Sequence, residues 1–323
     1  MVKIKYVITM RECDLLIIGA GAAGLAAGIY SARYGLNTLI LEEKVTGGLT
    51  ATAPFIENYP GFIKIPGIEL MDKIAEHAET FGVEVEEVTK ITDIKIEGKL
   101  SINVTDEEGM TYKGKACILA TGTEHKKLNI PGESELTGKG VSYCSTCDGP
   151  IFKNRKVAIV GGGNNACISA IYMDESLKSQ VSLIHRRDEL RAEKALRKDI
   201  KKNENITKYW NSTVQEIKGD DKVKAVVLKN SKTNELEEVK FDGVFINIGE
   251  LPRNELAKKL NVELDDYGYI NVNRKQETNV KGIYAAGDVT GGILQTCTAV
   301  GEGCTAAVYA YLYIQGGWYS EEK

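Results

Sequence analysis

The sequence predicts an α/β protein with two Rossmann-like, three-layer ββα nucleotide-binding domains, the second inserted into the first. Two glycine-rich turns carry this prediction. GAGAAG at 19–24 follows the apolar run DLLII at 14–18, and GGGNNA at 161–166 follows KVAIV at 156–160. β-rich sequence comes after each copy and supplies the additional layer. The chain of 323 residues has room for about two such domains.

Each copy continues as a helix followed by a second strand. After the first turn, LAAGIYSARYG at 25–35 predicts a helix that ends at Gly35, and NTLILEE at 37–43 predicts a strand. After the second turn, CISAIYMDESL at 167–177 predicts a helix and QVSLIH at 180–185 a strand. This strand–turn–helix–strand order is the frame in which a glycine-rich turn binds a dinucleotide.

Three later strands that end at or near a glycine place the domain boundaries. They are CILATG at 117–122, FINIG at 245–249 and GIYAAGD at 282–288, and the last precedes an alanine-rich helix at 297–314. The links between the domains are expected near 122–127 and 249–254. The first domain therefore comprises 1–124 and 252–323, and the inserted second domain comprises 125–251.

The first glycine turn has the residues that a dinucleotide requires. Gly19 allows the tight turn, Gly21 lets the backbone approach a pyrophosphate, and Gly24 lets the helix pack close to the strand. The start of the helix offers free N–H groups to the phosphates. Glu42 ends the second strand, where a carboxylate accepts from an unphosphorylated ribose. The first site is therefore predicted to bind FAD.

The second copy differs where nucleotides are discriminated. Its second strand ends in His185, and Arg186, Arg187 and Arg191 follow within a few residues. Guanidinium groups bind a 2′-phosphate, which an acid would repel. Because Arg187 and Arg191 are four apart, one helix face is expected to present both. The alternative is a solvated helix in which the acids of RRDEL pair with the arginines. We predict NADPH at this site.

Composition excludes several classes. The net charge is −4 and the isoelectric point about 5.7, which argues against a nucleic-acid-binding surface. No apolar stretch approaches the roughly 18–20 residues that span a bilayer. The start, MVKIKYVITMRECD, lacks an apolar signal core. We therefore expect a cytoplasmic protein, in which most of the seven cysteines are reduced.

The segment SYCSTCDG at 142–149 contains the one closely spaced cysteine pair, Cys144 and Cys147. A zinc site normally needs a second ligand pair, which the sequence lacks. A structural disulfide that closes so small a loop gains little and is unexpected in cytosol. A redox pair remains, and Asp148 can exchange protons with its thiols. The alternative for Asp148 is an exposed turn residue. The isolated Cys117, Cys167 and Cys304 are expected to pack in the core.

The sequence resembles the low-molecular-weight thioredoxin reductases of the bacterial and archaeal type, closest to an archaeal branch. The motifs are GAGAAG, ENYPGF, ATG, CSTCDG, GGGNNA, HRRDELRAEK and AAGDV, and together they cover nearly the whole chain. The resemblance implies that NADPH reduces FAD, that FAD reduces the Cys144–Cys147 disulfide, and that the dithiol reduces a thioredoxin or glutaredoxin-like protein. Cys147 would lie nearest the flavin, Cys144 would attack the partner, and Asp148 would be the acid/base. A homodimer is also implied.

The resemblance also implies the cofactor contacts. Those for FAD are Gly19, Gly21, Ala22, Gly24, Glu42, Gly48, Leu49, Thr50, Asn58, Ala120, Thr121, Gly122, Gly287, Asp288, Gln295 and Thr296. Those for NADPH are Gly161, Gly163, Asn164, Asn165, His185, Arg186, Arg187 and Arg191.

The sequence departs from the commonest family pattern at three places. Leu49 replaces an amide, no carboxylate follows the second glycine turn at 167–170, and Leu294 stands where many members carry arginine. Three alternatives stay open: a flavin dithiol oxidase that uses oxygen, a disulfide reductase fed by ferredoxin or another donor, and a redox-regulated binding module with a structural flavin. Ferredoxin–NADP reductases of similar fold lack the cysteine pair.

Overall fold

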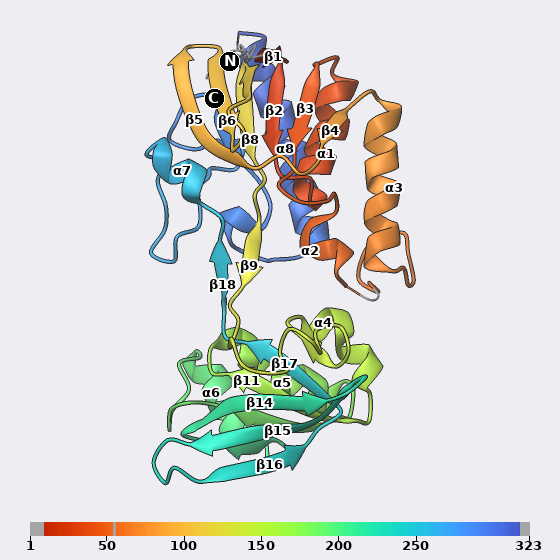
Figure 1. Ribbon diagram of the computed structural model, residues 1–323, viewed down its shortest axis with the longest axis vertical. Coiled ribbons are helices and arrows are strands. Elements are labelled where there is room, and N and C mark those ends of the chain that lie inside the picture. Colours follow the sequence, from red (N-terminus) through yellow and green to blue (C-terminus); the bar gives the residue numbers. More distant parts are fainter. Residues whose placement is uncertain (1–9, 54–55, 317–323) are drawn as a thin grey trace, which may run out of the picture. The chain divides into compact units, whose positions relative to one another are not determined.

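The computed structural model describes residues 10–53 and 56–316, which form two compact units. The first unit contains the described residues of 1–52, 59–124 and 251–323, and the second contains those of 53–58 and 125–250. The two crossovers, β9 (Thr123–His125) and β18 (Glu250–Pro252), pair as a two-stranded sheet (Figure 1). We expected no apolar signal core at the start of the chain. Most of that segment, residues 1–9, lies outside the described residues.

A parallel five-stranded sheet forms the centre of the first unit. Its order is β19 (Ile283–Ala285), β8 (Ala116–Leu119), β2 (Leu15–Ile18), β3 (Thr38–Leu41) and β4 (Glu84–Glu86). The first strand of the glycine motif, β2, therefore lies in the middle of the sheet. Its carboxyl end is next to that of β8, and such an edge is where open α/β sheets bind ligands.

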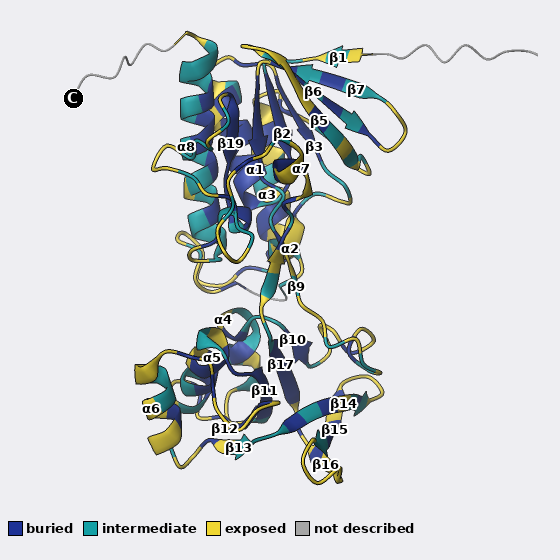
Figure 2. Ribbon diagram, turned by 90° about the vertical axis from the view of Figure 1, so that its left-hand side faces the viewer, coloured by how far each residue is buried: buried dark blue, intermediate teal, exposed yellow. Residues whose placement is uncertain are grey.

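Alternating side chains of β2 produce the layers of this unit. Leu15 and Ile17 pack on one face with helices α1 (Ala22–Arg33), α3 (Gly67–Thr80) and α8 (Thr296–Ile314). Leu16 and Ile18 pack on the other face with the sheet β1 (Met10–Glu12), β7 (Thr111–Gly114), β6 (Ser101–Asp106) and β5 (Ile91–Gly98). Figure 2 shows α8 on one side of β2 and β3, and β5 to β7 on the other. Each buried side chain contributes about 1.5–3 kcal/mol.

The second unit repeats this plan. Its parallel sheet has the order β10 (Val141–Ser142), β17 (Gly243–Asn247), β11 (Lys156–Gly161), β12 (Gln180–Ile184) and β13 (Thr207–Tyr209). Val157 and Ile159 face α5 (Asn164–Glu175) and α6 (Lys194–Lys202). Ala158 and Val160 face the antiparallel sheet β14 (Ser212–Gly219), β15 (Val223–Asn230) and β16 (Leu236–Lys240). The predicted fold class is confirmed.

The remaining short elements complete the architecture. They are α2 (Gly48–Ala51), α4 (Ser145–Asp148), α7 (Glu255–Lys259) and the 3₁₀ turns at Gly149–Phe152 and Asp288–Thr290. Within residues 10–53 and 56–316, no helix combines the length and the apolarity needed to cross a bilayer.

Candidate active site

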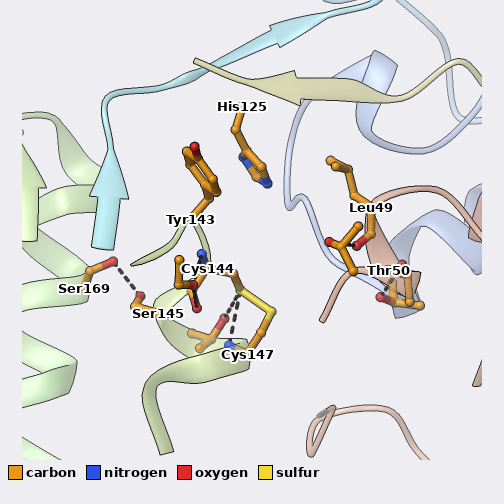
Figure 3. The surroundings of a disulfide bond; sticks show 12 residues. Leu49, Thr50, His125, Tyr143, Cys144, Ser145, Cys147 and Ser169 are labelled. Atoms are coloured by element: carbon orange, nitrogen blue, oxygen red, sulfur yellow. Dashed lines mark hydrogen bonds between the residues drawn. A yellow bond between two sulfur atoms is a disulfide. The ribbon is translucent and has the colours of Figure 1, made fainter. Parts of the chain in front are cut away.

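The two cysteines of CSTC form a disulfide at the start of a short helix. Cys144 is the N-cap of α4, and its Cα lies 5.4 Å from that of Cys147 across the bond (Figure 3). The Cys147 N–H donates to Sγ of Cys144 at 3.2 Å, and the Thr146 hydroxyl lies 3.3 Å from the same sulfur. In the reduced protein, donors at this sulfur favour its thiolate form. The arrangement therefore favours Cys144 as the nucleophile.

Asp148 is a largely buried acid at the end of α4. Its Oδ1 atom is inaccessible and has no hydrogen-bond partner among the described residues. Burial raises the pKa of the Asp148 carboxyl, and a hydrogen bond with the Ser142 side chain opposes that rise. The alternative of an exposed turn residue is therefore wrong. A carboxyl that ionises less readily than usual suits proton transfer to and from sulfur.

Tyr143, the residue before Cys144, is held by three contacts. The Tyr143 hydroxyl donates to Oε1 of the buried Glu133 at 2.9 Å, and the Tyr143 ring stacks on His125 with centroids 4.8 Å apart and planes within 2° (Figure 3). The Asn247 amide donates to the Tyr143 carbonyl at 3.3 Å. The sequence analysis missed these contacts, because they join residues up to 104 positions apart.

A pair of serine hydroxyls connects α4 to α5. Ser145, inside the CSTC segment, lies with its Oγ 2.6 Å from Oγ of Ser169, and both side chains are buried (Figure 3). Ser169 belongs to the CISA run that follows the second glycine turn. The helix that carries the disulfide is thus attached to the helix that starts at that turn.

The first glycine turn fits a bound dinucleotide. Gly21 caps α1 without a side-chain hydrogen bond, so the first N–H groups of the helix have no capping side chain. A Cβ at Gly21 would meet only Cα of Gly48, at 4.0 Å, which leaves the turn open to phosphate. The Glu42 carboxylate accepts from the N–H groups of Ala20 at 2.7 Å and Lys44 at 2.9 Å. These bonds hold the carboxylate at the strand end, with lone pairs left for a ribose.

Position 24 in this turn has no room for a side chain. A Cβ there would lie 1.8 Å from the carbonyl oxygen of Gly19, so α1 would have to move away from β2. We expect Gly24→Ala to lower the free energy of unfolding by about 1–3 kcal/mol and to weaken FAD binding. Gly301→Ala in α8 is the matched control, because a Cβ there meets nothing within 4 Å. It should stabilise the protein by about 0.5–1 kcal/mol. Urea unfolding of both variants would show the contrast, and equal effects would contradict the account.

The structure brings most other predicted FAD contacts together in the first unit. Gly48, Leu49 and Thr50 lie on α2, Ala120, Thr121 and Gly122 follow β8, and Gly287 and Asp288 follow β19. Thr50 and Thr296 lie with their hydroxyls 3.0 Å apart. Gln295 caps α8 through its side chain. Asn58 is different, since it belongs to the segment 53–58 that clusters with the second unit.

Glu302 is a half-buried carboxylate that the sequence analysis missed. It accepts from the Gly287 N–H at 2.8 Å and from the Thr290 hydroxyl at 3.1 Å. Burial raises its pKa, and these two hydrogen bonds oppose the rise. Glu302 therefore holds the AAGDV turn from α8, six residues beyond Thr296, the last of the expected contacts. A single acid in an otherwise apolar helix, AVGEGCTAA, was the available signal.

The second glycine turn is also open to a phosphate. Gly163 caps α5 without a side-chain hydrogen bond, and a Cβ there would meet nothing within 4 Å. At Gly161 a Cβ would lie 2.3 Å from the Asn247 carbonyl oxygen, so the turn is tight where the backbone crosses the sheet edge. Asn165 lies in the first turn of α5. The turn fits the pyrophosphate of a nucleotide.

The basic segment is a loop and not a helix, so the predicted helix face is wrong. It runs from the end of β12 to α6, which begins only at Lys194. The Arg191 N–H donates to the Gly162 carbonyl at 2.7 Å, which holds the loop on the glycine turn. The Asn164 amide donates to Glu193 at 2.9 Å and its oxygen accepts from the Glu193 N–H at 2.9 Å. The Asn164 side chain, which was expected to contact the pyrophosphate, thus holds the loop in place.

The three arginines of this loop are exposed and unneutralised. The nearby acids pair elsewhere: Asp188 with Lys232 at 3.0 Å and Glu189 with Arg197 at 2.6 Å. Within the described residues, no carboxylate pairs with Arg186, Arg187 or Arg191. The alternative in which these acids neutralise the arginines is therefore wrong. The loop presents three free guanidinium groups beside an open phosphate turn.

His185 lies beneath this loop. It is 5% exposed, its Nε2 lies 3.1 Å from the Glu189 carbonyl, and Trp210 packs edge-on against its ring. Burial lowers the pKa of His185, so the neutral ring is favoured. A Cβ at Gly162 would lie 2.1 Å from the ring. His185 therefore supports the loop from inside, and its predicted contact with NADPH stays a prediction.

Two open glycine turns at sheet edges, a free arginine loop and a disulfide next to a buried carboxyl define a class: nucleotide-dependent disulfide oxidoreductases. Comparison with known proteins agrees. The model of the family described as pyridine nucleotide-disulphide oxidoreductase matches residues 13–303. A thioredoxin reductase of Bacillus subtilis (strain 168) is 43% identical over 306 residues, which cover 94% of this chain and 95% of that protein.

Solved structures extend the comparison. The thioredoxin reductase of Streptococcus pyogenes MGAS5005 aligns with a TM-score of 0.86 and 38% identity, over 94% of this chain and 98% of that one. A ferredoxin-flavin thioredoxin reductase of Clostridium acetobutylicum aligns with a TM-score of 0.52 and 35% identity, over 95% and 99%. The chain belongs to the thioredoxin reductases of the pyridine nucleotide-disulphide oxidoreductase family. It is an FAD-dependent oxidoreductase, and family membership confirms the predicted cofactors, FAD and NADPH, and the predicted disulfide-reductase activity.

Proposed function

We propose that NADPH-derived electrons reduce the Cys144–Cys147 disulfide, and that the dithiol then reduces a thioredoxin or a glutaredoxin-like protein. The observation that carries the proposal is the disulfide at α4 with a largely buried carboxyl of raised pKa in the same helix. We propose further that the first unit binds FAD and the second NADPH. FAD, when bound, supplies a carrier that accepts a hydride and passes on two electrons.

The protein contributes binding and orientation for both cofactors. Uncapped N–H groups at Gly21 and the fixed Glu42 carboxylate would hold the FAD pyrophosphate and ribose. The N-terminus of α5 would hold the NADPH pyrophosphate. Arg186, Arg187 and Arg191 would hold its 2′-phosphate. The remaining residues predicted from the resemblance complete both sites.

The dithiol chemistry balances on this chain's own groups. The Cys144 thiol gives its proton to the Asp148 carboxylate, and the resulting thiolate attacks one sulfur of the partner's disulfide. A mixed disulfide forms, and the departing partner sulfur takes the proton that Asp148 received. The Cys147 thiol then gives its proton to Asp148, and its thiolate attacks Sγ of Cys144. This reforms the Cys144–Cys147 disulfide and releases the second partner sulfur, which takes that proton. Two electrons and two protons pass to the partner in each cycle.

A pocket in the second unit supports partner binding near these groups. It encloses about 240 Å³ and is lined by Asp148, Ser142, the apolar Ile151 and Phe152, and the cationic Lys139 and Lys222, among others. The Ile151 side chain is 50% exposed. We propose that an apolar side chain of the partner enters this pocket during exchange.

Three finer statements rest on the family resemblance and the sequence. We propose a homodimer and a cytoplasmic location, the latter consistent with an absence of spanning helices in the described residues. The motif variants at Leu49 and Leu294 support placement near an archaeal branch.

The proposal is tested by coupling NADPH oxidation to reduction of thioredoxin, with oxygen consumption followed in parallel. NADPH consumption that depends on oxidised thioredoxin and consumes no oxygen is expected. A similarity to a ferredoxin-flavin thioredoxin reductase favours a second candidate, in which ferredoxin is the donor. Thioredoxin reduction with reduced ferredoxin alone would establish that candidate, and oxygen consumption with a small dithiol would establish an oxidase.

Asp148→Asn separates activity from stability. Burial raises the pKa of Asp148 above that in the unfolded chain, so the folded state binds the proton more tightly. Stability is therefore lost as pH rises through the folded pKa, and the neutral asparagine should stabilise the protein at neutral pH. Thioredoxin reduction should fall by roughly a hundredfold or more. Thermal unfolding at several pH values and steady-state rates measure both effects. A lower melting temperature with unchanged activity would contradict the assignment.

A further inference from the structure

Helix α6 carries a concentrated positive charge in a chain whose net charge is −4. Residues 186–208, which include the arginine loop and α6, contain nine Lys or Arg and five Asp or Glu, a net charge of +4. Figure 2 shows α6 at the surface of the second unit, with most of its residues exposed. The exposed lysines of α6 form what we call the lysine face: Lys194, Lys198, Lys201 and Lys202. The roles proposed above assign these lysines no function.

The four lysines share one side of the helix. They are spaced four, seven and eight residues from Lys194, which follows the helical period and brings their side chains to one face. The other side of α6 packs on the core of the second unit, where Ile200 is fully buried and Leu196 partly buried. Within residues 10–53 and 56–316, no carboxylate pairs with a lysine of this face, and the one acid of α6, Asp199, is exposed. The lysine face is therefore a free positive surface.

Two contacts hold α6 next to the second glycine turn. Glu193, the N-cap of α6, exchanges two hydrogen bonds with Asn164, the first residue of α5. Arg197 of α6 pairs with Glu189 of the arginine loop at 2.6 Å. The nine residues of α6 span about 13 Å, whereas the Debye length is about 30 Å at 10 mM ionic strength and about 8 Å at physiological salt. At low salt the field of the whole lysine face therefore reaches the turn.

This arrangement is unfavourable for the helix itself. Lys198 lies four residues from both Lys194 and Lys202, and like charges at this spacing destabilise a helix. Lys194 is also the first residue of α6, where the helix dipole favours an anion, and the first turn contains no acid. The dipole favours cations only in the last turn, at Lys201 and Lys202. Helix stability therefore does not explain the lysines nearest the glycine turn, whereas attraction of an anion to that turn does.

We propose that the lysine face attracts NADPH by long-range electrostatics and directs it to the arginine loop, which then binds the 2′-phosphate. The inference rests on the proposed binding of NADPH by the second unit. Because NADPH is a polyanion, a positive surface beside its site raises its local concentration and accelerates its association. The lysine face governs how fast the nucleotide arrives, and the arginine loop governs how long it stays. Loss of the lysines should therefore lower the association rate constant and leave the dissociation rate constant almost unchanged.

The test replaces all four lysines of the face with glutamine, which has nearly the same helix propensity. The probe is NADP⁺, because it has the 2′-phosphate and cannot reduce the flavin. Its association with the FAD-loaded protein is followed by surface plasmon resonance and by stopped-flow fluorescence of Trp210, which packs on His185 beneath the arginine loop. We expect the association rate constant at about 10 mM ionic strength to fall by roughly tenfold for NADP⁺ and by roughly twofold for the less charged NAD⁺.

The matched control removes the same charge from the first unit. It replaces four exposed lysines with glutamine: Lys73, Lys99, Lys258 and Lys281. NADP⁺ association should fall much less in this control than in the variant of the lysine face. Arginine at the four positions of the lysine face should keep the wild-type rate constant, and high salt should remove the difference between the glutamine variant and the wild type.

An unchanged association rate constant in the glutamine variant, or an equal fall in the first-unit control, would overturn the inference. Slower reduction of thioredoxin with unchanged NADP⁺ association would also overturn it and would assign the lysine face to protein docking. If the glutamine variant does not fold, the wild type decides, since association that is independent of salt would overturn the inference. Failure of the proposed NADPH site is seen separately, as unchanged NADP⁺ affinity in Arg186→Ala combined with Arg187→Ala.

Discussion

Cys144→Ser abolishes reduction of thioredoxin, with a loss on the order of a thousandfold or more, because it removes the thiol that attacks the partner. The remaining five cysteines are free thiols, and burial raises the pKa of each of them. Cys167 is fully buried, and burial raises the pKa of its thiol to about 11. The measurement is the steady-state rate with oxidised thioredoxin. Cys167→Ala is the control and should retain turnover.

Cys147→Ser completes this test by separating the two sulfurs. Cys144 alone should capture a thioredoxin that carries one active-site cysteine activated by a small disulfide-linked leaving group, and the product should be a stable mixed disulfide. Cys144→Ser should capture little. Capture through Cys147 and not through Cys144, seen by non-reducing electrophoresis, would reverse the assignment of the attacking sulfur.

Arg186→Ala combined with Arg187→Ala weakens NADPH binding by about 3 kcal/mol or more, a factor on the order of a hundred, while NADH binding changes little. The reason is that both guanidinium groups are free of carboxylates, since Asp188 and Glu189 pair with other cations. Calorimetric titration with each nucleotide measures the difference. Arg197→Ala is the control, because Arg197 pairs with Glu189.

An equal loss for NADPH and NADH would remove phosphate recognition from this loop and favour a purely structural role. A loss of nucleotide affinity that is seen only in Arg197→Ala would also argue against phosphate recognition by Arg186 and Arg187. If the double variant loses affinity for neither nucleotide, these two arginines do not bind the 2′-phosphate of NADPH. That result would favour a different electron donor.

Local pattern was sufficient for the central strands and helices. The continuous apolar run at β2 and the glycines after it predict a strand, a turn and a helix, because burial on both faces and an open backbone leave few other solutions. The predicted end of the first helix at Gly35 is confirmed to within two residues. Gly35 has φ +82°, the conformation that ends a helix, while α1 itself stops at Arg33.

The errors lie where distant residues decide the structure. RRDELRAEK has helical spacing, but the bond from Arg191 to Gly162 and the Asn164–Glu193 pair hold it as a loop. Spacing within one segment does not contain this information. For the same reason the contacts of Tyr143 with Glu133 and His125 were not predicted, because only the fold brings these side chains together.

The central claim is that NADPH opens the Cys144–Cys147 disulfide. The most direct measurement is anaerobic incubation of the FAD-loaded protein with NADPH or with NADH, followed by alkylation and mass spectrometry of the peptide that contains both cysteines. The account predicts alkylation of Cys144 and Cys147 after NADPH, and little after an equal concentration of NADH. A disulfide that stays intact with NADPH would contradict it.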